Sequence, residues 1–406
     1  MEVALIGLGF VSGIGLARGL GPHGRGQLAA ALMWPALFTM LVTFGLPHAF
    51  AYASGAGWAS PERLRRLAVR FTLCAGIPAM VFYWILCPWI FRNQFAGEIW
   101  IPRMYGLSIP LGLHAGLLLP VFQGCGDFRR WNMGRLFRGA AWALFVVSLG
   151  AFHRMSVPVL LLVQAAISLL LGYYLYQRIS RLSFTEAQEK SAPFGWIFRY
   201  GRAIYISSVA YTINQQLDQL LLSLWVSPSE LGQYSVSVTL AGILLPIPAA
   251  IGPILFSKMA RDSNDVEKQE YHQKIALLFS ISILIPAGLA LALIGPWLAS
   301  AIFGAEFVVA GRILRVLAPA TVLLGIGNIL SDVLRGAGKP MYSSYGLMAG
   351  IAFTVPGLIW ALPRFGIWGA AWVSLAAYAT MMVVQLYFWR QWKSEIASTA
   401  ATSTTP

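Results

Sequence analysis

The sequence predicts an all-α protein that crosses a membrane about twelve times, and three observations lead to this prediction. Apolar residues make up 58% of the chain and charged residues only 11%, whereas soluble domains carry about 25% charged residues. Runs of roughly 20 apolar residues, the length of a helix that crosses a hydrocarbon core, follow one another along almost the whole chain. The second half also repeats short motifs of the first half in the same order.

The apolar runs predict helices because lipid offers no water to unpaired backbone groups. The alternative, a closed barrel, requires an alternation of polar and apolar residues that these runs lack. The first run is short and has no Lys or Arg before it, and it lacks the basic start and the cleavage site of a signal peptide. The expected transmembrane segments are residues 3–17, 28–51, 67–91, 104–125, 136–152, 155–177, 203–226, 234–257, 275–297, 312–334, 341–362 and 367–389.

Repeated motifs divide the chain into two halves. Residues 22–27 (PHGRGQ) follow the first segment and residues 228–233 (PSELGQ) follow the seventh, at an offset of 206 residues. Pro47 and Pro253 have the same offset. Two further pairs follow in order, residues 95–98 with 303–306 and residues 124–126 with 336–338.

Duplicated halves with a path between them are typical of transporters. We therefore expect an N-terminal six-helix lobe at 1–177, a cytoplasmic linker at 178–202, a C-terminal six-helix lobe at 203–389 and a cytoplasmic tail at 390–406.

The distribution of Lys and Arg predicts the orientation. If the N-terminus is cytoplasmic, 21 of the 29 basic residues fall in cytoplasmic segments and eight on the other side, so both termini are expected to be cytoplasmic. Basic loops that face an anionic leaflet account for the net charge of +14, and their dispersal argues against a nucleic-acid partner. The three Cys and five His are scattered, so we expect neither a metal site nor a cofactor.

Polar residues inside apolar segments are costly and therefore mark candidate sites. The seventh segment is the richest in them, and its polar residues recur every three or four positions on one helix face. Asp218 is the central residue of this face. It either carries a coupling H⁺ or Na⁺ or orients an arginine of a cavity, or else it is a buried hydrogen-bonded strut between helices. The face comprises Ser207, Tyr211, Asn214, Gln215 and Asp218.

Basic residues and prolines supply the remaining candidates. Arginines at the outer ends of the first and tenth segments suit a phosphate-bearing substrate, because a planar guanidinium pairs bidentately with phosphate oxygens. Asp332 and Arg335 of the tenth segment are expected to pair with each other, in a structural ion pair or in a transport role. Prolines of the second and eighth segments permit gating bends or are static kinks. The arginines are Arg18, Arg25, Arg312 and Arg315, and the prolines are Pro35, Pro47, Pro246, Pro248 and Pro253.

Several of these residues resemble a known family. Residues 17–27 carry an Arg and a Leu-Gly-Pro turn, and residues 216–220 (QLDQL) with 232–234 (GQY) are the more specific match. Both stretches resemble the polysaccharide flippases of the multidrug/oligosaccharidyl-lipid/polysaccharide exporter superfamily. The resemblance covers nearly the whole chain and implies two six-helix lobes, related by an axis along the membrane normal, that open alternately to each side. The departures are the short first segment and twelve segments where some relatives have fourteen.

This resemblance implies the export of a lipid-linked oligosaccharide across the bacterial inner membrane. The substrate would typically be an undecaprenyl-pyrophosphate repeat unit for O-antigen, capsule or exopolysaccharide, with a polymerase and glycosyltransferases as partners. A cation-coupled drug antiporter of the same superfamily is the alternative. The acids of the first six segments lie near segment ends or in loops, which favours an anionic substrate.

A membrane glycosyltransferase or polymerase is a second alternative. It normally requires carboxylates or a large folded loop on the outer side, whereas the outer loops here are short and their acids dispersed. The sequence therefore predicts a transporter and not an enzyme.

Overall fold

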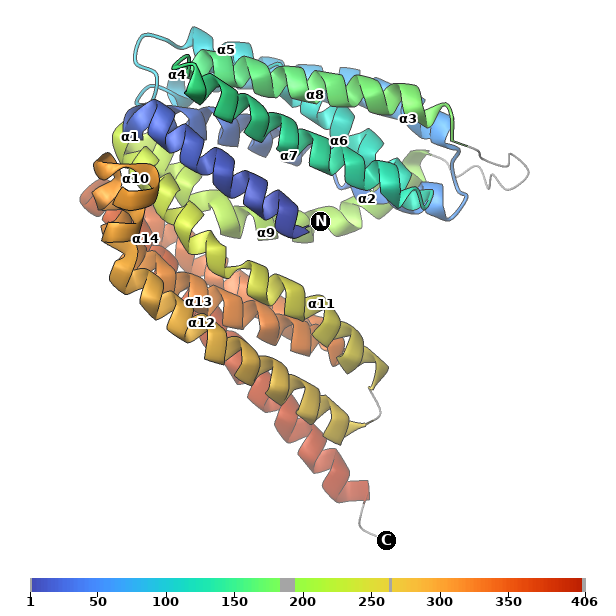
Figure 1. The fold of residues 1–406 in the computed structure, drawn as a ribbon. Coiled ribbons are helices and arrows are strands. Elements are labelled where there is room, and N and C mark those ends of the chain that lie inside the picture. The colour runs from blue at the N-terminus through green and yellow to red at the C-terminus, as the bar shows by residue number, and fades with distance from the viewer. Residues whose placement is uncertain (1, 183–193, 263–264, 404–406) are drawn as a thin grey trace. The chain divides into compact units, whose positions relative to one another are not determined.

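The computed structural model of the chain confirms the all-α class, with helices and no strand in the residues that it describes (Figure 1). These residues are 2–182, 194–262 and 265–403. The chain divides into two compact units. Unit 1 comprises Met1–Thr212 and Val226–Gly232, and unit 2 comprises Ile213–Trp225 and Gln233–Pro406.

The helices follow one another with short connections. The first half holds α1 (Glu2–Thr43), α2 (Leu46–Gly55), α3 (Pro61–Phe71), a π-helical turn (Thr72–Gly76), α4 (Ile77–Ile90), α5 (Trp100–Tyr105), α6 (Ser108–Gly124), α7 (Phe128–Ala151) and α8 (Val157–Ile179). The second half holds α9 (Phe194–Trp225), α10 (Pro228–Ala241), a 3₁₀ turn (Gly242–Leu244), α11 (Pro246–Arg261), α12 (Val266–Phe303), a 3₁₀ turn (Ala305–Phe307), α13 (Val308–Gly336) and α14 (Pro340–Ser403).

Every predicted segment falls on helix, but the count of twelve membrane spans is not confirmed. Two predicted boundaries coincide with kinks, where Gly21 inside α1 and Gly366 inside α14 have non-helical backbone angles, with φ values of 63° and 51°. Glycine adopts a positive φ without steric cost, so α1 and α14 each consist of two helical stretches joined at a kink. Within the described residues, seven helices are long and apolar enough to span, or eight if the bent pair α10–α11 is one span.

Unit 1 is organised around α6, which packs against α2 and α8. Leu117 of α6 is buried in the same apolar cluster as Phe50 of α2 and Leu175 of α8. Gly124 allows a close approach, because a Cβ on it would overlap Ser54 and the backbone of α2. The interior of this unit is therefore made of apolar side chains and close helix contacts, as expected for membrane helices.

The predicted linker at 178–202 is partly helical, since α9 begins at Phe194. Aromatic rings at the start of α9 pack on α2 and the residues after it. The Trp196 and Trp58 ring centroids are 4.0 Å apart, and those of Tyr200 and Tyr52 are 4.6 Å apart. Residues 183–193 lie outside the described residues, and the lobe boundaries stay a prediction.

Unit 2 is built around α13, which is the most buried of its long helices and packs against α11, α12 and α14. Gly311 of α13 meets the backbone of α12 at Gly295, where a Cβ would overlap a carbonyl group. The predicted pairing at the end of α13 is confirmed, with Arg335 and Asp332 joined at 2.6 Å. Asp332 is also tucked against Gly252 of α11, so the ion pair lies at a helix contact.

The positions of the helix bends match the positions of the prolines only in part. In the first half the helix breaks at Phe44 and Gly45, both with positive φ, and Pro47 belongs to the first turn of α2. In the second half the 42° bend precedes Pro246 and Pro248, whereas Pro253 lies inside α11. Pro47 thus lies at the start of a new helix, where proline is tolerated, whereas Pro253 lies within a continuous helix. Pro35 lies inside α1, and a gating role for any of the five prolines stays a prediction.

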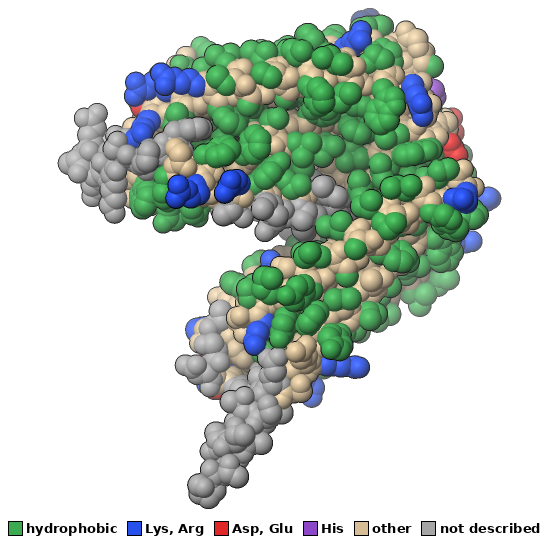
Figure 2. Space-filling model, turned by 180° about the vertical axis from the view of Figure 1, so that it is seen from behind, with side chains coloured by type: hydrophobic (Ala, Val, Ile, Leu, Met, Phe, Trp, Pro, Cys, Tyr) green, Lys and Arg blue, Asp and Glu red, His purple; other side chains and the backbone are tan. Residues whose placement is uncertain are grey.

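Hydrophobic side chains cover most of the face of each unit seen in Figure 2. Ile85 is 67% exposed, Leu144 66% and Trp297 68%. Soluble monomers rarely expose contiguous apolar surface of this extent. The protein is therefore a multi-pass membrane protein, and its orientation and the position of its termini stay predictions.

Candidate substrate and coupling sites

The repeated motif, residues 22–27 and 228–233, forms the first helical turns after Gly21 in α1 and at the start of α10, and the two copies of this turn motif make a reciprocal contact in unit 1. A Cβ on Gly26 would overlap the carbonyl group of Pro228, and a Cβ on Gly232 would overlap the carbonyl group of Pro22. The 206-residue offset relates Gly26 to Gly232 and Pro22 to Pro228, so each copy presents its glycine to the other copy's proline. Only glycine lets two backbones approach this closely. Such reciprocity is what a duplicated motif produces.

The glutamine after each glycine ties its own turn to an equivalent loop. Gln27 Nε2 donates to the carbonyl oxygen of Gln94 at 2.9 Å. In unit 2, Gln233 Nε2 donates to the carbonyl oxygen of Glu306 at 2.6 Å, and Gln233 Oε1 accepts from the backbone N–H of Ala310 at 2.9 Å. These loops contain the repeated motifs at residues 95–98 and 303–306. Gln94 directly precedes the first of them, and Glu306 is the last residue of the second. The two halves thus use the same residue type to fix the same connection.

Arg25 lies beside the reciprocal contact, between Gly24 and Gly26, and is partly buried. Its Nε is buried without a hydrogen-bond partner, and none of the carboxylates that the structure describes forms an ion pair with it. A partly buried cation without a counter-charge is costly. The arrangement therefore suits an anionic ligand that supplies the missing partner.

Asp218 of α9 accepts three hydrogen bonds in unit 2. The Tyr234 hydroxyl of α10 donates to Oδ2 at 2.6 Å, and the Ser374 hydroxyl of α14 donates to the same oxygen at 3.4 Å. The backbone N–H of Gln219 donates to Oδ1 at 2.7 Å. None of these donors is a cation, and Asp218 forms no ion pair with the residues described. A carboxylate held in this way can take up a proton or a small cation without breaking an ion pair.

A cavity of about 80 Å³ adjoins Asp218. Gln215 of α9, Thr321 of α13 and Tyr378 of α14 contribute polar groups to its lining, together with Ser374 and several apolar side chains. The space holds a few waters or a small cation. It is far below the roughly 300–1,000 Å³ of small-molecule sites, so it is not a binding site for a sugar.

The four candidate arginines are not among the residues that line this cavity. Arg312 and Arg315 are exposed on α13, and Arg18 is exposed on α1. None of these three, nor Arg25, lines the cavity. The side chains of Tyr211 and Asn214 on α9 lie outside the described residues. The structure thus places Asp218 and Gln215 at one cavity, and none of the four arginines lines it.

Two residues of the Asp218 cluster, Tyr234 and Ser374, were missed as site candidates. Tyr234 is fully buried, and a buried tyrosine hydroxyl normally has a hydrogen-bond partner. This rule singles out Tyr234 once its segment is expected to be buried. Ser374 is 156 positions from Asp218, and nothing in its local sequence indicates the contact.

The fold resembles solved transporters. It is similar to the inward closed conformation of the lipid II flippase MurJ, with a TM-score of 0.78 and 13% identity over 96% of this chain and 87% of that one. It is also similar to an inward-facing multidrug resistance transporter of the MATE family in the MOP superfamily, with a TM-score of 0.75 and 16% identity over 99% of this chain and 96% of that one. At these identities the likeness shows the fold alone.

Two archaeal proteins are similar in sequence. The uncharacterized membrane protein MJ1068 of Methanocaldococcus jannaschii is 23% identical over 257 residues, which are 61% of this chain and 50% of the relative. The probable low-salt glycan biosynthesis flippase Agl15 of Haloferax volcanii is 20% identical over 194 residues, which are 47% of this chain and 41% of the relative. The chain therefore spans half or less of the length of these relatives.

A family model described as polysaccharide biosynthesis protein matches residues 15–312, more than half of the chain. The relatives and solved structures whose names state an activity are flippases and transporters, not enzymes. This match agrees with the resemblance seen in the residues of the first and seventh segments. The chain belongs to the polysaccharide biosynthesis protein family, and it has the fold of the MurJ and MATE transporters.

Proposed function

We propose that the protein flips a polyprenyl-pyrophosphate-linked oligosaccharide across the bacterial inner membrane by alternating access, for the synthesis of a cell-surface polysaccharide. The physical task is to move a sugar and its phosphates through oil while the lipid tail stays in the bilayer. The family match and the transporter fold support this proposal. A polymerase and glycosyltransferases would act before and after the flipping step.

The proposal depends on one observation, the buried guanidinium nitrogen of Arg25 that has no hydrogen-bond partner. A guanidinium offers phosphate oxygens a fork of parallel N–H donors. The turn itself does not require a cation, because the equivalent residue of the second half is Leu231, which is fully buried. A cation at only one of two equivalent turns is therefore better explained by a ligand than by the fold.

The exposed arginines extend the same chemistry. Arg312 and Arg315 are three residues apart on α13, so they share a helix face. Together with Arg18 they are further candidates for contacts with a pyrophosphate along the path. Exposed guanidinium groups compensate for the hydration that the phosphates lose on leaving water.

Asp218 is the proposed coupling residue. Rocking between two states requires a ligand or an ion that binds one state better than the other. A carboxylate beside a small cavity, held by hydroxyl groups, provides a place for H⁺ or Na⁺. In this proposal the ion gradient drives the cycle through Asp218 while the arginines bind the substrate.

A cation-coupled multidrug antiporter of the same superfamily is the second candidate. It is favoured by the MATE-like fold and by an Asp218 carboxylate that lacks a cationic partner among the described residues. In that case Asp218 would contact the drug cation itself, and Arg25 would have no substrate role.

Mass spectrometry of lipid-linked oligosaccharides distinguishes the two functions. In cells depleted of the protein, with a face-selective probe, we expect a pyrophosphate-linked glycan to accumulate on the cytoplasmic face. Wild type and Arg364→Gln, which alters an exposed arginine bound to Trp360, should reverse the accumulation, whereas Arg25→Gln should not. Arg25→Lys should reverse it in part, because it retains the charge but not the fork. An unchanged glycan pool with raised sensitivity to cationic dyes would overturn the flippase proposal in favour of the antiporter.

A further inference from the structure

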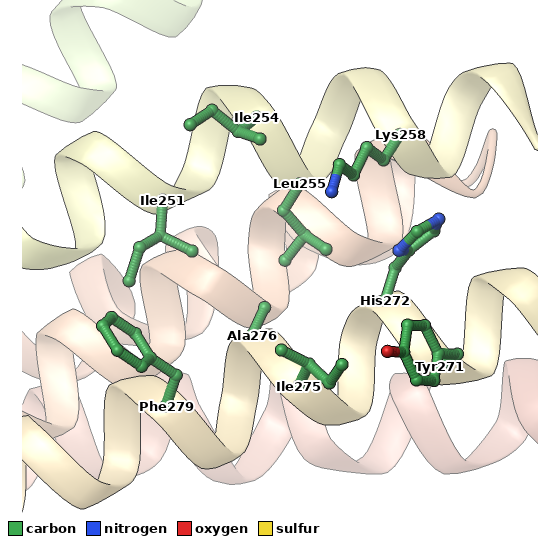
Figure 3. Close-up of a pocket in the computed structure, with 9 residues that line it drawn as sticks. All are labelled: Ile251, Ile254, Leu255, Lys258, Tyr271, His272, Ile275, Ala276 and Phe279. Carbon is green, nitrogen blue, oxygen red and sulfur yellow. The ribbon is translucent and has the colours of Figure 1, made fainter.

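A groove of about 360 Å³ lies between α11 and α12 of unit 2, and the proposed transport cycle does not use it (Figure 3). Its two ends differ in chemistry. Lys258, Tyr271 and His272 lie together at one end, and the Lys258 amine is directed between the two helices (Figure 3). The rest of the lining is apolar and includes Ile254 of α11 and Phe279 of α12.

The polar end carries a positive charge that the protein does not neutralise. Lys258 is exposed and forms no ion pair with any carboxylate that the structure describes. The nearest acid in sequence, Asp262, already accepts from His272 Nε2 at 3.0 Å and lies 3.6 Å from Arg261. On the α12 side, Glu270 is paired with Lys393 at 2.9 Å. The amine is therefore available to an anionic group that enters the groove.

The apolar part of the groove is open. Ile254 is 60% exposed, Ile275 48% and Phe279 54%. In a membrane protein such side chains are covered by hydrocarbon rather than by water. An occupant of this groove must therefore combine a hydrocarbon chain with an anionic group at one end.

We propose that this groove binds one anionic membrane phospholipid. Its phosphate accepts hydrogen bonds from the Lys258 amine and the Tyr271 hydroxyl, and one acyl chain lies along Ile254, Ile275 and Phe279. Lysine binds phosphate as a point charge, and basic pockets between membrane helices are known sites for anionic head groups. On the predicted topology this end of α11 faces the cytoplasmic leaflet, which carries the anionic lipids. The site does not depend on which substrate the protein transports.

Native mass spectrometry of the full chain in detergent tests the charge at the site. The probes are phosphatidylglycerol and phosphatidylcholine with the same acyl chains. We expect preferential binding of phosphatidylglycerol to wild type, and a roughly five-fold weaker binding to Lys258→Ala, the effect of one Lys near a membrane surface. Lys274→Ala removes an exposed lysine of α12 that does not line the groove, so it should bind like wild type. Equal losses in the two variants would indicate diffuse surface charge and overturn the proposal.

A second pair of variants tests the groove without changing its charge. Ile275→Trp fills the apolar part and should reduce binding of phosphatidylglycerol, whereas Leu278→Trp alters an exposed residue of α12 outside the groove and should not. Unchanged binding to Ile275→Trp would overturn the proposal. So would tight binding of a polyprenyl phosphate in place of phosphatidylglycerol, because the groove would then belong to the lipid tail of the substrate.

Discussion

The two copies of the turn motif have the same backbone contacts but differ in the polar residues beside them. Gly26 and Gly232 each meet the other copy's proline carbonyl, and Gln27 and Gln233 each bind an equivalent loop. The neighbouring positions diverge. At the 206-residue offset, Arg25 corresponds to Leu231, Asp218 to Ser12, and Tyr234 to Leu28.

This divergence separates what the fold requires from what the function requires. Features present in both copies, such as the glycine contacts, are explained by packing of the duplicated helices. Features present in one copy cannot be needed for that packing, and these are the cation of the first half and the hydrogen-bonded carboxylate of the second. On the proposed function, the partly buried arginine that binds the substrate and the carboxylate that couples the ion therefore lie in different halves of the chain.

The largest expected effect concerns the contacts that the copies share. Gly26→Ala and Gly232→Ala each place a Cβ against a backbone carbonyl, which cannot rotate away as a side chain can. We expect each substitution to lower the free energy of unfolding by about 3 kcal/mol. Thermal unfolding in detergent micelles measures both.

Gly116→Ala is the matched control, because a Cβ on this exposed glycine of α6 meets nothing within 4 Å. It should stabilise the helix by about 0.5–1 kcal/mol. A large loss for Gly26→Ala together with none for Gly232→Ala would contradict the reciprocal contact.

The next largest effect concerns the carboxylate found in one copy. Asp218→Asn keeps the shape of the side chain and removes its charge, so transport should no longer respond to an imposed H⁺ or Na⁺ gradient. One coupled charge is worth about 2.3 kcal/mol per 100 mV of membrane potential. Transport by the full chain in proteoliposomes, with and without an imposed gradient, measures the loss.

The equivalent residue in the first half supplies the control. Ser12 donates to the carbonyl oxygen of Gly9 within its own helix, so Ser12→Ala should leave coupling unchanged. Asp332→Asn, which breaks the ion pair with Arg335, should affect stability but not the response to the gradient. Transport by Asp218→Asn that still follows the gradient would assign Asp218 to a structural role.

A smaller effect is expected for the hydroxyl that holds the carboxylate. Tyr234→Phe retains the ring but removes the hydroxyl donor 2.6 Å from Asp218. The equivalent position of the first half is the apolar Leu28, which has no such donor. A hydrogen bond to a charged group contributes about 1.5–3 kcal/mol, and a neutral one about 1. Unfolding measurements on Tyr234→Phe, Asp218→Asn and the double variant give the coupling energy between the two side chains. A coupling energy near zero would contradict the contact.

The helices were predictable and the bends only in part, for a physical reason. Apolar runs report the hydrocarbon thickness that a segment must cross, and so the segments all fall on helix. The bends at Gly21 and Gly366 depend on a single positive φ, and the break at Phe44 and Gly45 needs no proline. The kinks at Gly21 and Gly366 fall in gaps between predicted segments, whereas the break at Phe44 and Gly45 lies inside the predicted segment 28–51, because apolar length contains no information about one dihedral angle.

Of the candidate site, Asp218 and Gln215 were predictable from the sequence, whereas Tyr234 and Ser374 were not. A carboxylate in an apolar run is expensive, so Asp218 stands out from sequence alone. Serine and tyrosine are inexpensive in membrane helices, and the contact of Ser374 with Asp218 joins two positions that are 156 residues apart in the sequence. Arg25 was predicted as a phosphate ligand by residue type, but its lack of a partner is visible only in three dimensions.

The smallest expected effect is the difference in stability that Gln27 and Gln233 give to the two copies of the motif. Gln27 makes one hydrogen bond to its loop through Nε2, whereas Gln233 makes two, since its Oε1 also accepts from the backbone N–H of Ala310. Each bond contributes about 1 kcal/mol. Gln233→Leu should therefore destabilise the protein by about 1 kcal/mol more than Gln27→Leu, measured as the difference in unfolding free energy between the two variants. Equal losses would mean that the second bond adds nothing and that the two turns are fixed to the same degree. A larger loss for Gln27→Leu would show that the first half depends more on its turn, which the contacts of the two copies do not predict.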